Sequence, residues 1–292
     1  MTLRIGTCSW KFDSWQGLIY SEKGKQNYLE EYTRQYNTVE IDQWFWSLFG
    51  SGVPKLPEPQ VVENYLESVP ADFTFSIKMP NSITLTHYYQ KDKRAPLQEN
   101  PHFFSCELFH RFLERIEPLK EHLGPLMFQF EYLNKKKMPS QGEFLHKFTD
   151  FISKYPGGYD YAVETRNPNY LNWDFFDFLN THNLHYVFVQ KYYIPHIADV
   201  YKTYSANIKD LTVIRLMGPD RKGIEQKSGK KWDAVVQAKD EDLSTIVILV
   251  KELEEKGVRV YLNVNNHYEG SAPLTIRKIR EMLEVFGEPT PF

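Results

Sequence analysis

The chain contains 292 residues, of which 41% are hydrophobic and 25% are charged, so its composition is that of a globular protein and not of a disordered one. Its net charge of -3 provides no general attraction to nucleic acid or to an anionic membrane surface. The longest aliphatic run, Ile246 to Val250, is far shorter than the roughly 20 residues that span a bilayer, so no membrane-spanning segment is expected.

Short runs of β-branched and aromatic residues recur along the chain, and each is followed by a segment with helical periodicity. This alternation is typical of parallel strands joined by crossover helices. The predicted strands are Leu3–Gly6, Thr38–Ile41, Phe73–Ile77, Leu126–Phe130, Tyr161–Val163, Tyr186–Val189, Thr212–Leu216 and Val258–Val264. Eight such strands predict an α/β protein with a single (β/α)8 TIM-type barrel as one domain over residues 1–292.

The segments between these strands carry helical patterns of different strength. Clear patterns predict helices at Gln26–Tyr36, Gln60–Val69, Phe104–Leu119, Gly142–Ser153, Asp174–Asn180, Leu243–Lys256 and Pro273–Phe286. A weaker pattern covers Ile197 to Tyr204. The long charged stretch from Gly218 to Asp242 predicts a loop.

Cysteine usage indicates the compartment. The two cysteines, Cys8 and Cys106, are too few for the disulfide framework of small secreted proteins, and they lack metal-ligand spacing. The first residues lack the charged and apolar regions of a signal peptide and instead predict a strand. We therefore expect a soluble, cytoplasmic protein in which Cys8 is a packed thiol.

In a barrel of this type the carboxyl ends of the strands surround one shared pocket, so the residues at these ends are the candidate site residues. Trp10 follows the first strand and is suited either to stacking on a ligand or to core packing. Glu40 and Asp42 end the second strand, and strand alternation places them on one face. Two neighbouring carboxylates would supply a general acid or bind a cation, and a structural ion pair is the alternative.

The next three strands add charged and amide side chains. Lys78 follows the third strand and would neutralise an anionic ligand, whereas Gln129 interrupts the fourth and either faces the pocket or makes an interior hydrogen bond. Glu164 and Arg166 leave the fifth strand with a spacing of two, which points them the same way. Arginine would bind a carboxylate or phosphate while glutamate orients it or acts as acid or base, unless the two form an internal salt bridge.

The last three strands complete the candidate pocket. Gln190 ends the sixth strand, and Arg215 lies within the apolar seventh strand, where a buried charge requires a partner. After the eighth strand come hydrogen-bonding residues and a helix start that is suited to receiving an anion. These residues are Asn265, Asn266, His267 and Tyr268. His267 titrates near neutral pH and would act as acid or base, or it is a structural hydrogen-bonding group.

Common catalytic motifs do not occur. The sequence contains no Gly-x-x-x-x-Gly-Lys-Ser/Thr loop, Gly-x-Gly-x-x-Gly fingerprint, His-Glu-x-x-His pair or Gly-x-Ser-x-Gly elbow. The usual nucleotide-binding, zinc-protease and serine-hydrolase classes therefore lose support.

Taken together, the strand-end segments resemble the YecE-like family, domain of unknown function 72. The resembling segments are residues 4–10, 36–42, 75–78, 128–130, 162–168 and 265–273. The resemblance implies a TIM-type barrel over nearly the whole chain and supplies no established activity. The chain departs from the family pattern at Cys8-Ser9-Trp10, where Ser-Gly-Trp is commoner, and at Gln43-Trp44-Phe45-Trp46.

Two functional interpretations remain open at this point, beside a third, a purely structural interaction protein, which gives no reason for polar residues to converge in the mouth of a barrel. The first is an enzyme that acts on a small polar or anionic metabolite, with Glu40, Asp42, Glu164 and His267 as acid, base or cation ligands. Its metal-dependent version is a sugar isomerase or hydrolase with a divalent ion. The second is a noncatalytic binding module for a phosphorylated ligand or single-stranded nucleic acid, of which nucleic acid is the less favoured partner. The sequence specifies no oligomeric state.

Overall fold

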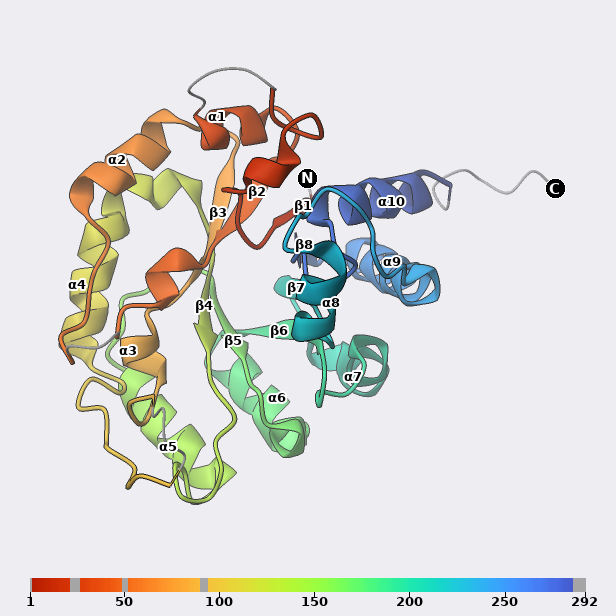
Figure 1. Cartoon of the computed structure of the whole chain (residues 1–292). Coiled ribbons are helices and arrows are strands. Elements are labelled where there is room, and N and C mark those ends of the chain that lie inside the picture. Colours follow the sequence, from red (N-terminus) through yellow and green to blue (C-terminus); the bar gives the residue numbers. More distant parts are fainter. Residues whose placement is uncertain (1, 22–26, 49–51, 90–93, 286–292) are drawn as a thin grey trace. The chain divides into compact units, whose positions relative to one another are not determined.

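The computed structural model describes residues 2–21, 27–48, 52–89 and 94–285 (Figure 1). Its strands are β1 (Leu3–Thr7), β2 (Thr38–Ile41), β3 (Thr74–Lys78), β4 (Leu123–Gln129), β5 (Tyr161–Glu164), β6 (His185–Lys191), β7 (Leu211–Gly218) and β8 (Arg259–Val264). Their order is β1-β8-β7-β6-β5-β4-β3-β2. The order follows the chain except that β1 lies beside β8, which is the neighbour relation of a (β/α)8 barrel, so the predicted fold class is confirmed.

Ten α-helices and five short 3-10 helices connect the strands in the described ranges. The α-helices are α1 (Tyr28–Thr33), α2 (Pro59–Glu67), α3 (Asn81–Thr84), α4 (Cys106–Ile116), α5 (Gln141–Ile152), α6 (Trp173–Thr181), α7 (Ile197–Tyr204), α8 (Arg221–Ser228), α9 (Asp240–Glu255) and α10 (Ala272–Val285). The 3-10 helices are η1 (Asp13–Trp15), η2 (Gln43–Phe45), η3 (Glu117–His122), η4 (Pro168–Tyr170) and η5 (Ser205–Asn207). No helix within these ranges is long and apolar enough to cross a membrane.

The seven clearly predicted helices and the weaker one at 197–204 are confirmed, although Gln26 and Phe286 lie outside the described residues. The predicted loop from Gly218 to Asp242 is wrong because it contains α8. Asp220 caps this helix by accepting a hydrogen bond from the Gly223 amide at 2.9 Å. Gly229 ends it in the left-handed region, with φ of 59°. Of the α8 residues only Ile224 is buried, so helical apolar periodicity was too sparse to indicate it.

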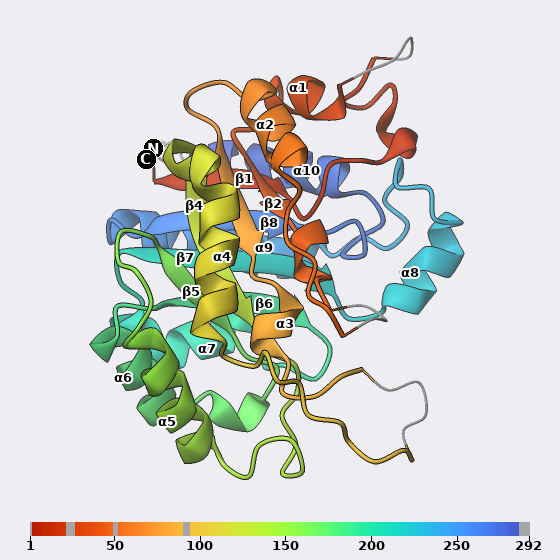
Figure 2. The ribbon, with the colours of Figure 1, turned by 90° about the vertical axis from the view of Figure 1, so that its left-hand side faces the viewer.

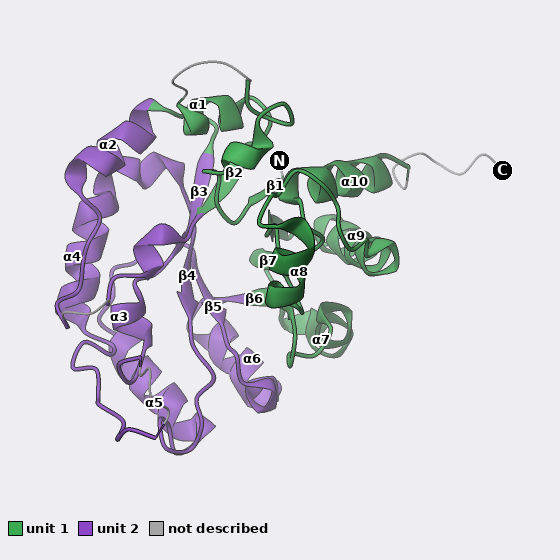
Figure 3. Cartoon of the chain, viewed as in Figure 1, with its two compact units in different colours: residues 1–40, 68–73, 187–292 green, residues 41–67, 74–186 purple. Residues whose placement is uncertain are grey.

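The chain divides into two compact units (Figure 3). Unit 1 contains residues 1–40, 68–73 and 187–292, and unit 2 contains residues 41–67 and 74–186. In unit 1, β8 lies between β1 and β7, and Val264 is level with Thr7 and with Leu216. The loops that follow these three strands therefore leave from the same edge of the unit 1 sheet.

Unit 2 is built from β3, β4 and β5 with helices packed on them. Figure 2 shows α4 in front of the strands of unit 2. Phe128 on β4 packs against Phe109 of α4 at 5.8 Å and against Phe148 of α5 at 5.7 Å, measured between ring centroids. The strand register sets Gln129 opposite Glu164, which brings two predicted site residues to neighbouring strand ends.

Candidate functional site

A fully buried ion pair joins β2 to β7 inside unit 1. Arg215 Nε donates a hydrogen bond to Glu40 Oε2, and Arg215 Nη2 donates one to Glu40 Oε1, each at 2.7 Å. The side chains of Arg215 and Glu40 are 2% and 0% exposed. The Asn263 amide donates to the same carboxylate at 3.4 Å. Two parallel hydrogen bonds compensate part of the cost of burying both charges, so the partner that Arg215 was expected to require is Glu40.

His267, in the loop after β8, has a hydrogen-bonding partner at each ring nitrogen. Nδ1 lies 2.6 Å from Asn265 Oδ1, and Nε2 lies 3.0 Å from Glu225 Oε1 on α8. Trp232 packs edge-on against the imidazole, with ring centroids 4.9 Å apart. Burial lowers the pKa of His267 below 6.5, and the hydrogen bond with Glu225 acts in the opposite direction.

The Glu225 carboxylate is shared between His267 and Arg221. Arg221 Nε donates to the same oxygen, Glu225 Oε1, at 2.7 Å. The hydrogen bonds from Arg221 and from His267 lower the pKa of the Glu225 carboxyl, so this group is ionised at neutral pH. The side chains of Arg221, Glu225 and His267 are 75%, 22% and 18% exposed, and together they form a rim cluster that solvent reaches.

A second cluster in unit 1 is centred on Asp242 in the first turn of α9. Tyr268 donates its hydroxyl proton to Asp242 Oδ2 at 2.6 Å, and His196 Nε2 lies 2.5 Å from Oδ1. The Gln190 amide donates to both oxygens, at 3.2 and 3.3 Å. Asp242 therefore ties the end of β6, the start of α7 and the loop after β8 to one carboxylate. Burial and the hydrogen bond with Asp242 raise the pKa of Tyr268.

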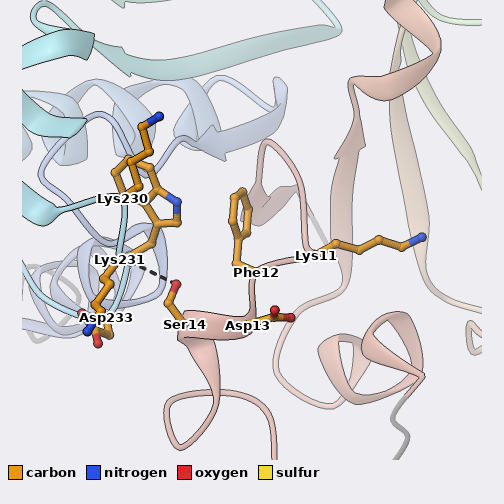
Figure 4. Close-up of a pocket in the computed structure, with 8 residues that line it drawn as sticks. Lys11, Phe12, Asp13, Ser14, Lys230, Lys231 and Asp233 are labelled. Carbon is orange, nitrogen blue, oxygen red and sulfur yellow. Dashed lines mark hydrogen bonds between the residues drawn. The ribbon is translucent and has the colours of Figure 1, made fainter. Parts of the chain in front are cut away.

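A pocket of about 550 Å³ opens between the loop after β1 and the segment that follows α8. Its lining residues are Lys11, Phe12, Asp13, Ser14, Lys230, Lys231, Trp232 and Asp233. Figure 4 shows Phe12 standing between Lys11 on one side and Lys230 and Lys231 on the other. The Trp232 amide donates to Ser14 Oγ at 3.0 Å and thereby joins the two walls. Trp232 connects this pocket to the rim cluster because it also contacts His267.

The predicted Glu-Arg pair at the end of β5 forms in unit 2. Arg166 Nη2 lies 2.5 Å from Glu164 Oε1, and it donates to Gln129 Oε1 at 3.3 Å. The Glu164 side chain is 1% exposed and that of Arg166 is 14% exposed. The structure thus brings together three of the predicted site residues, Gln129, Glu164 and Arg166.

Lys78 and Asp42, also in unit 2, have different surroundings. Lys78 is buried at 7% exposure, and its ammonium group lies 3.9 Å from the centroid of the Phe45 ring, a cation-π contact. Asp42 follows the last residue of β2 and has helical backbone angles, φ -102° and ψ -16°, at the start of η2. Strand alternation therefore ends at Ile41. The prediction that alternation places Glu40 and Asp42 on one face does not apply to Asp42.

Two other predicted ligand-binding residues have structural contacts. Trp10 is only 1% exposed, and its carbonyl accepts a hydrogen bond from the Tyr20 hydroxyl, so its ring belongs to the core of unit 1. Asn266 Oδ1 accepts the amide proton of Ala272 at 2.8 Å and caps α10. The sequence predicted that the N-terminus of this helix receives an anion. In the structure its first amide, that of Ala272, donates to Asn266 instead.

Sequence reasoning missed Glu225, Trp232, His196 and Asp242. The first two lie in the segment that was interpreted as a loop, and the sequence Asp220 to Gly229 carried a cap and a glycine stop that would have indicated α8. Asp242 lies two residues inside α9, whose start was predicted one residue too late to include it. His196 precedes α7 and accepts the Ala198 amide proton at 3.1 Å, a cap that histidine seldom provides.

The divalent metal of the metal-dependent interpretation has no preassembled ligand set within the described residues, where no three His, Cys, Asp or Glu side chains gather as metal ligands. The carboxylate of Glu40 is engaged by Arg215, and that of Glu225 by Arg221 and His267. These groups act in the structure as ion-pair partners.

Comparison with solved structures shows the fold. A DUF72 family protein from Enterococcus faecalis aligns with a TM-score of 0.67 and 17% identity, over 99% of this chain and 99% of that protein. A DUF72 family protein from Thermotoga maritima aligns with a TM-score of 0.67 and 23% identity, over 97% of this chain and 100% of that protein.

A sequence relative and a family model give the same assignment. UPF0759 protein YecE of Escherichia coli is 28% identical over 168 residues, which cover 57% of this chain and 49% of that relative, or about half of its length. The model of the family described as protein of unknown function DUF72 matches residues 4–291. The chain therefore belongs to the DUF72 family.

Proposed function

We propose that this protein is an enzyme that binds a small anionic metabolite in the pocket beside Trp232 and transfers a proton through His267. The observation that carries the proposal is the position of His267, which contacts Trp232 of the pocket and has both ring nitrogens held by defined partners. Histidine held in this way is the commonest acid or base in enzymes that work near neutral pH.

The charges of the pocket favour an anion. Lysines and aspartates both line it, with Lys230 and Lys231 on one wall, while Figure 4 shows the Lys11 side chain extending away from them. One of the aspartates, Asp13, already accepts a hydrogen bond from the Tyr28 hydroxyl at 2.7 Å. Among the described residues, the ammonium groups of Lys230 and Lys231 take part in no ion pair, so a carboxylate or phosphate would displace only water from them.

The backbone of Lys230 supports the same conclusion. This residue has a φ of 61°, in the left-handed region that a lysine seldom adopts. Such strained residues concentrate at functional sites, where surrounding structure holds them in place. The Lys230 amide donates to the Glu225 carbonyl at 3.2 Å, which holds this conformation at the end of α8 beside the pocket.

We place this activity in the cytoplasm, because neither Cys8 nor Cys106 forms a disulfide.

The alternative function, a noncatalytic module that binds single-stranded nucleic acid, draws support from the same pocket. Phe12 and Trp232 beside lysines are residue types that stack on bases and neutralise phosphates.

Isothermal titration calorimetry with inorganic phosphate, citrate, glycerol phosphate and a short oligothymidine strand tests both functions. We expect at least one small anion to bind, and the double variant Lys230→Ala/Lys231→Ala to weaken its binding about tenfold or more. The control Lys135→Ala/Lys136→Ala removes two exposed charges from unit 2 and should leave affinity unchanged. Binding of the oligothymidine alone, with a steep salt dependence, would favour the binding module, and no binding of any probe would contradict both.

A further inference from the structure

Both ring nitrogens of His267 face hydrogen-bond acceptors. Asn265 Oδ1 also accepts the backbone amide proton of His267, at 2.9 Å, which identifies this atom as the oxygen and not the nitrogen of the side-chain amide. Glu225 is ionised, since hydrogen bonds from Arg221 and His267 lower its pKa, and a carboxylate can only accept. Each contact of the imidazole therefore needs a proton on the histidine side.

A neutral imidazole carries one N–H, so it can satisfy one of the two contacts, whereas the imidazolium satisfies both. The charged groups around His267 act in opposite directions. Burial lowers its pKa, as do Arg221 on α8 and Lys191 at the end of β6, whereas Glu225 raises it. Burial is the largest of these influences and leaves the pKa of His267 below its ordinary value, while Glu225 is the neighbouring group that acts toward the protonated ring.

We propose that Glu225 is a positioning residue that opposes the effect of burial on His267, so that the imidazolium, once it forms, donates its Nε2 proton as the general acid of the reaction. This inference rests on the proposed function and specifies the direction of the proton transfer. The Nε2–H bond breaks, its electron pair stays on the imidazole, and the proton forms an O–H bond with an anionic oxygen of the bound metabolite. The imidazolium becomes neutral, the ligand loses one negative charge, and Glu225 stays ionised.

The geometry favours Nε2 as the proton donor. The distance from Nε2 to Glu225 Oε1 is 3.0 Å, longer than the 2.6 Å from Nδ1 to Asn265 Oδ1. The Glu225 side chain is also 22% exposed, so a ligand can reach it. A ligand oxygen that takes the place of Glu225 Oε1 would meet the same two cations, His267 and Arg221. The ligand class is therefore an anion with a protonatable oxygen, a carboxylate or a phosphate.

Nitrogen-15 NMR of the histidine side chains, recorded against pH on the full chain, tests the inference. Glu225→Gln should lower the proton affinity of His267 about tenfold, because an opposite charge at hydrogen-bond distance is removed. Arg221→Gln should raise it, because a like charge is removed. The conservative variant Glu225→Asp should restore part of the loss, and the control Glu241→Gln, at an exposed site on α9, should change nothing.

An unchanged proton affinity in Glu225→Gln, or shifts of the same sign in Glu225→Gln and Arg221→Gln, would overturn the inference. A merely structural role for Glu225 would change stability and would not produce opposite shifts. The titration needs no ligand, so it is independent of the calorimetry. Anion binding without the titration shifts would contradict the inference alone, whereas the absence of anion binding would contradict the proposed function.

Discussion

Two of the Glu-Arg ion pairs in unit 1 lie in opposite environments. Glu40 and Arg215 are 0% and 2% exposed and are joined by two hydrogen bonds. Glu225 and Arg221 are 22% and 75% exposed, and Arg221 contacts the same Glu225 oxygen as His267 does. A buried pair contributes to stability mainly because either partner alone would be a stranded charge. An exposed pair contributes little to stability and can exchange partners. Burial therefore indicates which acid has a structural role and which is available to a ligand.

The largest effect is expected for Glu40→Gln. The substitution leaves the Arg215 guanidinium buried without a carboxylate, which should lower the free energy of unfolding by about 3–5 kcal/mol. Urea denaturation followed by circular dichroism measures it. The matched substitution Glu225→Gln at the rim should lower stability much less, because solvent screens an exposed ion pair. Equal losses in the two variants would remove the distinction between the two pairs.

Asp242→Asn should have an intermediate effect. The Asp242 carboxylate accepts hydrogen bonds from Tyr268, Gln190 and His196, and the amide would replace one acceptor oxygen by a donor that faces donors. Hydrogen bonds to a charged group contribute about 1.5–3 kcal/mol, so a loss of stability in that range is expected. Urea denaturation measures this as well, and a loss below about 0.5 kcal/mol would show that water replaces the cluster without cost.

The sequence predicted elements better than contacts. Parallel strands and amphipathic helices depend on local periodicity, so the strands and the helices with dense apolar faces were found, and α8, with Ile224 as its buried residue, was not. The charge of Arg215 in an apolar strand indicated a buried partner, but the identity of that partner depends on how the fold brings together segments 175 residues apart. Glu225 and Trp232 meet His267 only through the tertiary fold, so no spacing in the sequence could pair them.

The pH dependence of stability distinguishes His267 from the interior pair. Because burial lowers the folded-state pKa of His267 below 6.5, the unfolded chain binds its proton more tightly. The contribution of His267 to stability is present above about pH 6.5 and is lost as the pH falls through the folded-state pKa. The stability difference between the unmodified protein and His267→Gln should therefore shrink between about pH 8 and about pH 5. A difference that grows on acidification would contradict this sign.

The smallest effect on stability, and the one that separates stability from binding most sharply, is expected for Lys230→Gly. Glycine adopts the left-handed conformation at φ of 61° without a steric penalty, so the release of strain opposes the larger entropy of the unfolded chain. The free energy of unfolding should stay the same or rise by up to about 1 kcal/mol, while anion binding should weaken because a positive charge leaves the pocket. Urea denaturation and calorimetry with inorganic phosphate measure the two quantities on one protein sample. Unchanged phosphate affinity in this variant would show that the side chain of Lys230 does not contribute to anion binding.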